Sequence, residues 1–328
     1  MSFGYEILGF GSFPKGGYEL AIPAGADGVI ESPTTYTDIA FDSQNPNKGL
    51  FVYSIASGAL NGWAVVFEIS GTTISFGTPT SLWSTGQFRD ANLYASPFEA
   101  DKYILGFEDY SPDAGAMVVT TSGTTITVHT YQEAFATYYG DSVTMKLDPH
   151  NDGKFYFFWR NHVSGANRAT CAIGSWDGNT VSFGSLATIG NPISGGSSNG
   201  NVSTWGSVDP LNENQALIGY SDYGGGTYDL FIHTIAVSGT QLDGHTYGDL
   251  GGTTITAGSS NDCNNENPSS VSCEWHGTES ERCFVVYNGD SGNTRWQALD
   301  YSGTTVTAQA EQNVHAGDRH NGRMVKNP

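Results

Sequence analysis

The chain has 328 residues, and its 33 acidic against 13 basic side chains give a formal net charge of −20. Because phosphate binding depends on lysine and arginine, this charge argues against a nucleic-acid-binding protein and disfavours an anionic membrane surface as partner. The 43 glycines and 12% aromatic residues, with only 14% charged residues, favour many short strands joined by turns over a helical fold.

The N-terminal segment predicts an incomplete structural unit. Residues 5–22 resemble residues 103–119: both have an apolar run, a polar glycine-containing loop and a second apolar run. This pattern predicts the last three strands of a four-stranded unit that lacks its first strand. The segment begins without a basic and apolar leader, so we expect no secretory signal and synthesis in a cytoplasm. No apolar run approaches the roughly 20 residues of a membrane-spanning helix, so no membrane insertion is expected.

Five complete units follow, and each carries a tight turn at the same place. The turn glycines at positions 71, 123, 178, 239 and 303 recur every 52 to 64 residues. Glycine adopts the positive φ of a hairpin turn, and the Ser or Asp before it can bond to its own backbone. A unit that returns at a near-fixed period indicates a repeat architecture.

Each unit contains a short run of apolar, aromatic and β-branched residues, the composition of a strand that is buried on both faces. Another strand precedes this run and ends at a turn such as Asp148-Pro149, because proline cannot continue the hydrogen-bond ladder. With a third strand and the strand after the glycine turn, each unit predicts four antiparallel strands. The five buried runs span residues 50–54, 103–108, 155–160, 216–221 and 283–288.

The C-terminal segment 321–328 resembles a first strand with its closing Asn-Pro turn. Four strands in a repeat of this length are typical of a β-propeller blade. We therefore predict an all-β, six-bladed β-propeller that forms a single domain over residues 1–328. The C-terminal strand would close the last blade beside the three N-terminal strands; five blades with extra termini is the alternative. The predicted blades span residues 35–84, 85–135, 136–190, 191–250, 251–312 and, for the composite blade, 313–328 with 1–34.

Function is expected on the face that carries the long loops. In a propeller, the loops after the second and fourth strands share one face, and here those loops are predicted to be the long ones. Their aromatic rings suit stacking on sugars or filling a protein interface, while anchoring of a loop onto its blade is the structural alternative. The candidate ligand-binding residues are Trp83, Tyr110, Tyr131, Tyr138, Tyr139, Tyr223 and Tyr247.

No catalytic, metal or cofactor site is predicted. The arginines share no blade position, as the arginine cluster of a sialidase would require, and the eight histidines show no ligand spacing. No phosphate-binding or dinucleotide glycine motif is present. Cys273 and Cys283 fall on consecutive strands, and together with Cys263 we expect them to be thiols or to form at most one disulfide.

The repeated unit, with an apolar strand, a polar loop, a third strand and then Ser-Gly-Thr-Thr-Ile-Ser-Phe-Gly-Thr-Pro (residues 70–79), resembles repeats in structural proteins of tailed bacteriophages, especially marine ones. The resemblance covers nearly the whole chain in five copies. It implies a virion-surface protein of the tail-fibre or capsid-decoration type, present in many copies and in contact with other virion proteins. It implies no catalytic residues.

The leading hypothesis is therefore a non-enzymatic bacteriophage virion protein that attaches to a host surface glycan, or to a neighbouring virion protein, through its long-loop face. Many copies on a symmetric particle would raise the avidity of weak single sites. A capsid decoration that contacts only virion proteins is a second hypothesis. A glycan-cleaving propeller hydrolase, which would release reducing sugar, and a cellular lectin-like adhesin are further alternatives.

Overall fold

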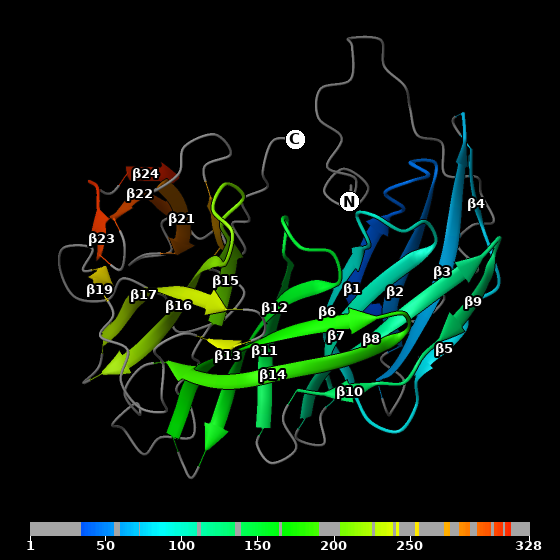
Figure 1. Ribbon diagram of the computed structural model, residues 1–328, viewed down its shortest axis with the longest axis horizontal. Helices are drawn as coiled ribbons and strands as arrows, with labels where there is room; N and C mark the ends of the chain where they lie inside the picture. The colour runs from blue at the N-terminus through cyan, green and yellow to red at the C-terminus, as the bar shows by residue number, and fades with distance from the viewer. Residues whose placement is uncertain are drawn as a thin grey trace.

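The computed structural model describes residues 34–55, 60–71, 73–109, 113–134, 139–163, 166–189, 204–224, 227–238, 241–242, 253–255, 272–275, 282–288, 294–302, 305–310 and 312–315. Within these residues the chain forms five antiparallel sheets (Figure 1). The prediction of an all-β fold is confirmed. The same residues contain no helix, and so none that could cross a membrane.

The strands follow the chain from sheet to sheet. The first sheet comprises β1 (Thr34–Phe41), β2 (Lys48–Ile55), β3 (Asn61–Ser70), β4 (Thr73–Phe76) and β5 (Thr80–Trp83). The second comprises β6 (Phe88–Ala95), β7 (Lys102–Asp109), β8 (Asp113–Ser122), β9 (Thr125–Val128) and β10 (Gln132–Glu133). The third comprises β11 (Tyr139–Leu147), β12 (Lys154–Val163), β13 (Ala166–Asp177) and β14 (Thr180–Ile189). The fourth comprises β15 (Thr204–Val208), β16 (Gln215–Gly224), β17 (Thr227–Ser238), β18 (Gln241–Leu242) and β19 (Thr253–Ile255). The fifth comprises β20 (Ser272–Trp275), β21 (Arg282–Asn288), β22 (Thr294–Ser302), β23 (Thr305–Ala308) and β24 (Gln312–His315).

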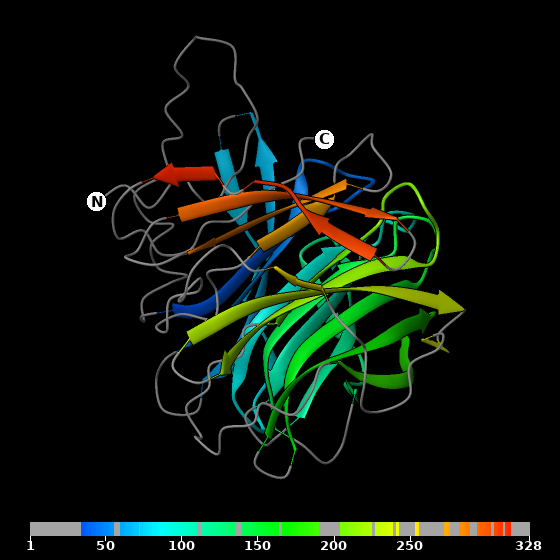
Figure 2. The same cartoon turned by 90° about the vertical axis from the view of Figure 1, so that its left-hand side faces the viewer.

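Each sheet is a meander in which consecutive strands pair, as in β1-β2-β3-β4. The first strands of successive sheets pack on one another: β1 on β6, β6 on β11, β11 on β15, and β15 on β20. The sheets therefore follow one another in chain order, from blue to red in Figure 1, and Figure 2 views them from the side of the fifth sheet. This arrangement is propeller-like. The predicted composite sixth blade falls mainly on residues 1–33 and 316–328, which lie outside the described residues.

The glycine turns between third and fourth strands have the predicted conformation in the first three sheets. Gly71, Gly123 and Gly178 have φ values of +59°, +57° and +56°. A Cβ atom would meet nothing at any of the three, so the backbone conformation and not a close contact is the reason for glycine. The turns at residues 239 and 303 lie outside the described part of the chain.

The outermost strand differs from the prediction of one fourth strand per unit. In the first, second, fourth and fifth sheets the third strand pairs with two short strands, as β3 does with β4 and β5. In the first sheet the interruption falls at Gly77 to Pro79, where Gly77 N still donates to Val66 O (2.9 Å) but proline has no N–H to donate. The long loop that was predicted after the fourth strand of the first unit thus contains a short strand, β5. In the third sheet the outer strand, β14, is continuous.

The core lies between the sheets, because the second strand of each of the first four sheets is buried on both faces. All residues of β7 are buried: Leu105 packs with residues of the first sheet and Ile104 with residues of the third. Gly106 of β7 lets the Phe157 ring of the third sheet approach, since a Cβ on this glycine would lie 2.8 Å from the ring. The near-continuous apolar runs in the sequence are explained by this two-sided burial.

The connections between first and second strands are turns of equal length in the first four sheets. They span six residues each in the first four sheets: 42–47, 96–101, 148–153 and 209–214. The leading side chain caps its own turn, since Asp148 Oδ1 accepts from His150 N (2.8 Å) and Asn151 N (3.2 Å). Conversely, the connections after second strands are short, with only residues 164–165 between β12 and β13. The paired strands extend into segments predicted as loops.

Buried lysines join these turns across neighbouring sheets. Lys48, at the start of β2, pairs with Asp101 in the turn of the second sheet. Lys154 Nζ likewise donates to Asn214 Oδ1 in the turn of the fourth sheet (2.9 Å). The corresponding position in the third sheet is Gly153, which has no side chain, and Lys102 instead pairs with Glu99 of its own turn (2.6 Å). A lysine therefore links two sheets only where the last residue of the following sheet's turn has a side chain that can accept its hydrogen bond.

Asp101 makes the stability of the first link depend on pH. Burial tends to raise the pKa of Asp101, but hydrogen bonds from Lys48 and Thr121 and the charge of Lys48 outweigh it and lower that pKa. A carboxyl whose pKa is lowered by folding stabilises the folded state when ionised, and this contribution is lost as the pH falls through its pKa. We expect Asp101→Asn to lower the free energy of unfolding at neutral pH, and the difference from wild type to shrink below about pH 4.

Urea denaturation at several pH values measures this difference. Asparagine suits the left-handed conformation of residue 101 (φ +60°), so the substitution changes the charge without new backbone strain. Asp152→Asn, at an exposed position of the third sheet's turn, is the matched control. A destabilisation by Asp101→Asn that stayed constant with pH would contradict the role of the ionised carboxylate.

Candidate ligand-binding site

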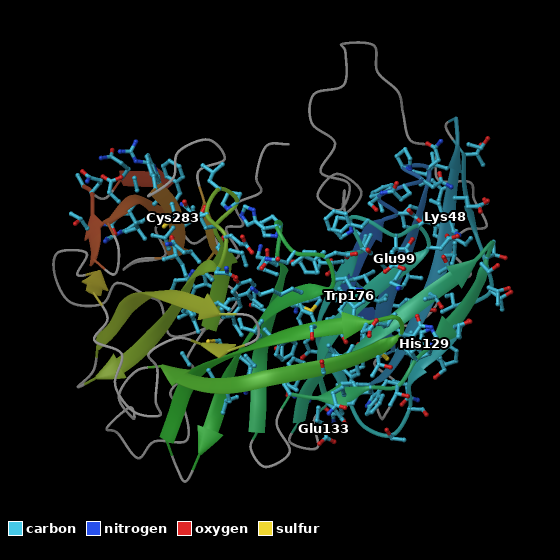
Figure 3. The ribbon with its side chains drawn as sticks, viewed as in Figure 1. Lys48, Glu99, His129, Glu133, Trp176 and Cys283 are labelled. Carbon is cyan, nitrogen blue, oxygen red and sulfur yellow. The ribbon has the colours of Figure 1, made fainter. Side chains whose placement is uncertain are left out.

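The candidate site lies at the end of the first two sheets that is opposite the six-residue turns. Figure 3 shows Lys48 and Glu99 toward the end with these turns, and Glu133 of β10 toward the opposite end. At that opposite end, the connections after second strands meet the last residues of the outer strands and the first residues of the next sheet's inner strand. This is the face on which function was predicted.

Two of the predicted ligand-binding residues are in contact. Trp83 ends β5 and Tyr131 immediately precedes β10, and their ring centroids lie 4.7 Å apart at an interplanar angle of 50°. Both rings also contact Phe107, with centroid distances of 5.4 Å and 4.9 Å. The structure therefore joins side chains from two neighbouring sheets that the sequence could only assign to the same face.

Two other predicted residues lie in strands, and the remaining three lie outside the described residues. Tyr139 and Tyr223 were expected in loops, but they lie within strands β11 and β16, where their backbones pair with His162 and Tyr228. This correction has the same cause as the short connections, since the hairpins extend further than predicted. Tyr110, Tyr138 and Tyr247 lie outside the described residues.

Trp83 and Tyr131 form an aromatic cluster with Phe88 and Phe107. Phe88 and Phe107 are fully buried, and their ring centroids lie 4.8 Å apart. Trp83 and Tyr131 are half-buried. Gly62 leaves room for Phe88, because a Cβ there would lie 2.6 Å from the ring. The two outer rings thus rest on the core between the first and second sheets and keep part of their surface in solvent. Anchoring and ligand contact are both compatible with this placement.

The inner strands of the first three sheets each contain a β-bulge at the same position. The pairing register shifts between Thr35 and Asp38 in β1, between Arg89 and Asn92 in β6, and at the equivalent place in β11. Tyr36 and Asp90 have φ values of +50° and +46°, a left-handed conformation that strains residues other than glycine. Bulges of this kind redirect side chains and occur often beside functional sites.

Contacts with the next sheet follow directly after the bulges. Asp38 Oδ2 accepts from Leu93 N of β6 (2.7 Å), and Asn92 Nδ2 donates to Val143 O of β11 (2.9 Å). The side chain two residues after the bulged residue therefore binds the inner strand of the following sheet. These hydrogen bonds hold the inner strands together where the backbone is strained.

Tyr36, Arg89, Asp90 and Glu108 gather at the bulges, and we call them the inner site. Tyr36 is 38% exposed, Arg89 and Asp90 are half-buried, and Glu108 is 7% exposed and lies opposite Arg89 in the β6–β7 pair. Burial raises the pKa of Tyr36; Arg89 opposes this effect, and Asp90 and Glu108 reinforce it. The phenol therefore stays protonated at neutral pH and can donate a hydrogen bond. Tyr36 and Asp90 were not among the site residues predicted from the sequence.

Asp109 adds a buried carboxylate on the opposite face of β7 from Glu108, because successive side chains of a strand alternate. Gly86 makes room for it, since a Cβ on this glycine would lie 1.7 Å from Asp109 Oδ1. Among the described residues, no three His, Cys, Asp or Glu side chains are placed to hold a metal ion.

The described cysteines show no reactive thiol at this site. Cys171 is free and buried, and burial strongly raises its pKa, which keeps it a thiol. Cys283 is also buried. Cys273 lies in β20 opposite Val285, and residue 263 lies outside the described residues.

No protein-family model matches the chain, and no curated protein matches it. Among solved structures, an α-L-arabinofuranosidase from Fusarium graminearum in complex with an iminosugar inhibitor is similar over 83% of this chain and 82% of that chain, with 10% identity and a TM-score of 0.48. Sqt1 from Chaetomium thermophilum is similar over 82% and 70%, with 10% identity and a TM-score of 0.45. A glycoside hydrolase is similar over 92% of this chain and 66% of that chain, with 12% identity and a TM-score of 0.39. These values are too low to assign an activity to the chain.

Proposed function

We propose that the protein is a non-enzymatic attachment protein on the surface of a bacteriophage particle, and that it binds a host surface glycan at the inner site. The observation that carries this proposal is Tyr36, a half-exposed ring in a strained backbone conformation beside Arg89, Asp90 and Glu108. An aromatic face stacks on the apolar face of a sugar, and charged groups form strong hydrogen bonds with its hydroxyls. Strain of this kind is typical of functional positions.

The placement on a virion rests on the resemblance of the repeats to phage structural proteins. Many copies on a symmetric particle would convert weak single sites into firm attachment. Gold-labelled antibody imaging of native particles tests this placement directly. Label on particle heads or tails would support it, whereas label on cell envelopes with none on particles would favour a lectin-like adhesin.

The proposed architecture is a closed ring of six blades. Packing of each first strand on the next through five successive sheets supports it, because a sixth sheet built from both ends of the chain would complete the same pattern. In such a ring the inner site would face the central channel, where residues of two neighbouring blades can reach one ligand.

A glycan-cleaving hydrolase is the second candidate, because Asp90 and Glu108 supply two carboxylates beside Tyr36. Glycoside hydrolysis by two carboxyl groups requires them to flank the scissile bond. Incubation with host polysaccharide separates the two functions: a binding protein leaves the polysaccharide intact, and a hydrolase releases reducing sugar.

Replacement of Tyr36 by alanine is expected to weaken binding to host polysaccharide by about tenfold or more, since the stacking ring and its hydroxyl are lost together. Binding of purified protein to immobilised polysaccharide measures the change. Tyr36→Gly removes the same ring but accepts the positive φ, so it separates loss of the ring from backbone strain. Phe76→Ala is the matched control, because Phe76 is equally exposed (39%) but lies on β4 in the outer part of the first sheet. Unchanged binding by both Tyr36 variants would contradict the proposed site.

A further inference from the structure

Three buried polar atoms around the aromatic cluster have no hydrogen-bond partner: Trp83 Nε1, Asn61 Oδ1 and Gln87 Oε1. They come from adjoining segments, because Gly62, next to Asn61, pairs with Trp83, and Gln87 precedes Phe88. Phe88 N also donates to Leu60 O (2.8 Å), which ties the second sheet to this corner of the first. A buried polar atom without a partner costs stability, so three in one corner call for a specific explanation.

The rings beside these atoms form a platform. Trp83 and Tyr131 lie 4.7 Å apart, are half-buried, and are supported from below by the fully buried Phe107. Rings fixed in this way lose little conformational entropy when a ligand stacks on them. The platform is therefore preorganised on its apolar side, and Trp83 Nε1, Asn61 Oδ1 and Gln87 Oε1 beside it have no hydrogen-bond partner.

We infer that Trp83, Tyr131, Asn61 and Gln87 form a second carbohydrate subsite, which takes one neutral pyranose unit. The apolar C–H face of the sugar would stack on Trp83, and Tyr131, whose ring is inclined by 50° to the indole, would contact the side of the sugar. Its hydroxyls both donate and accept, which matches one indole N–H donor and two amide oxygen acceptors. Asn61 Oδ1 and Gln87 Oε1 have no hydrogen bond to break, so these two side chains can turn toward the ligand without losing one, while the Trp83 ring stays in place.

The charge of the chain determines the class of sugar. The net charge of −20 and the buried Asp109 next to this corner disfavour a sugar that carries a carboxylate or sulfate. The subsite rests on the proposed function, because both take a glycan as the ligand. It uses other residues, since the inner site is built around the bulges within β1 and β6, whereas the subsite is built from the ends of strands β3, β5, β6 and β10.

The indole N–H of Trp83 offers a direct test by NMR of protein labelled with ¹⁵N-tryptophan. The chain has seven tryptophans, and the signal that disappears in Trp83→Phe is that of Trp83. Titration with the methyl pyranosides of glucose, galactose and mannose is expected to shift this signal for at least one sugar. The signal of Trp176, which is buried and stacks on Phe155, should stay in place. Asn61→Ala and Gln87→Ala are each expected to weaken the interaction by about threefold to tenfold.

The outcomes separate this subsite from the inner site. No shift of the Trp83 signal with any of the three glycosides overturns the subsite, even if Tyr36→Ala abolishes binding to polysaccharide. A shift of Trp83 that is weakened by Asn61→Ala and persists in Tyr36→Ala upholds the subsite. If Tyr36→Ala then also leaves polysaccharide binding intact, only the inner site fails.

Discussion

Replacement of Phe157 by alanine is expected to lower the free energy of unfolding by about 3–5 kcal/mol, the cost of removing a fully buried phenylalanine side chain. The ring has no exposed surface, lies against Gly106 of the second sheet, and contacts Trp159 and Phe183 with centroid distances of 5.5 Å each. These neighbours belong to regular strands of two packed sheets and cannot easily collapse into the space. Urea denaturation of wild type and variant measures the difference.

A double-mutant cycle with Gly106→Ala tests whether the contact between the sheets is the cause. In the wild-type background this methyl group would lie 2.8 Å from the Phe157 ring and should destabilise the protein. In the Phe157→Ala background the only remaining close neighbour of this methyl group is the flexible Met145 side chain, with Sδ at 3.1 Å, so most of the cost should disappear. Additive effects of the two substitutions would show that Gly106 and Phe157 do not meet as described.

Replacement of Lys154 by methionine should have the second large effect, a loss of about 3–5 kcal/mol, because it leaves a buried carboxylate without its cation. Lys154 Nζ lies 3.2 Å from Asp148 Oδ2, and the Asp148 side chain is fully buried. Methionine keeps the length and apolar character of the lysine stem, so the change removes mainly the charge and the hydrogen bond to Asn214.

Lys102→Met is the matched control for this prediction. Lys102 has the same place in the second sheet and a similarly buried side chain, but its partner Glu99 is 47% exposed and can be solvated by water. Exposed ion pairs contribute about 0–1 kcal/mol, so this variant should be close to wild type. Equal losses in both variants would mean that burial of the lysine stem, and not the partner carboxylate, decides the effect.

Features that depend on neighbouring residues in the chain could be predicted from the sequence. Gly71, Gly123 and Gly178 required positive φ, and the second strands required burial on two faces. Pro79 could also have predicted the interruption of the outer strand, since it cannot donate to the ladder. Each of these signals lies within a few residues of the feature that it determines.

The parts of the site that depend on contacts between sheets could not be predicted in the same way. Trp83 and Tyr131 were identified separately, but their contact requires the second sheet to pack on the first. Tyr36 carried no local signal, because the position of its bulge is supported by the hydrogen bond from Leu93 N to Asp38. The turns after the first strands were predicted, but their capping and the lysine links to the next sheet were not, because these side chains read as ordinary polar loop residues.

The interruption of the outermost strand has a consequence for how copies of the protein behave when they are crowded. A long, straight sheet edge recruits strands from other molecules and leads to aggregation. In four of the five described sheets the rim offers only ladders of two to four residues, as in β4, β5, β9 and β10. Copies at high local concentration therefore touch at these rims without fusing into a continuous sheet. The ten-residue β14 is the exception, and it is the edge on which such fusion would begin.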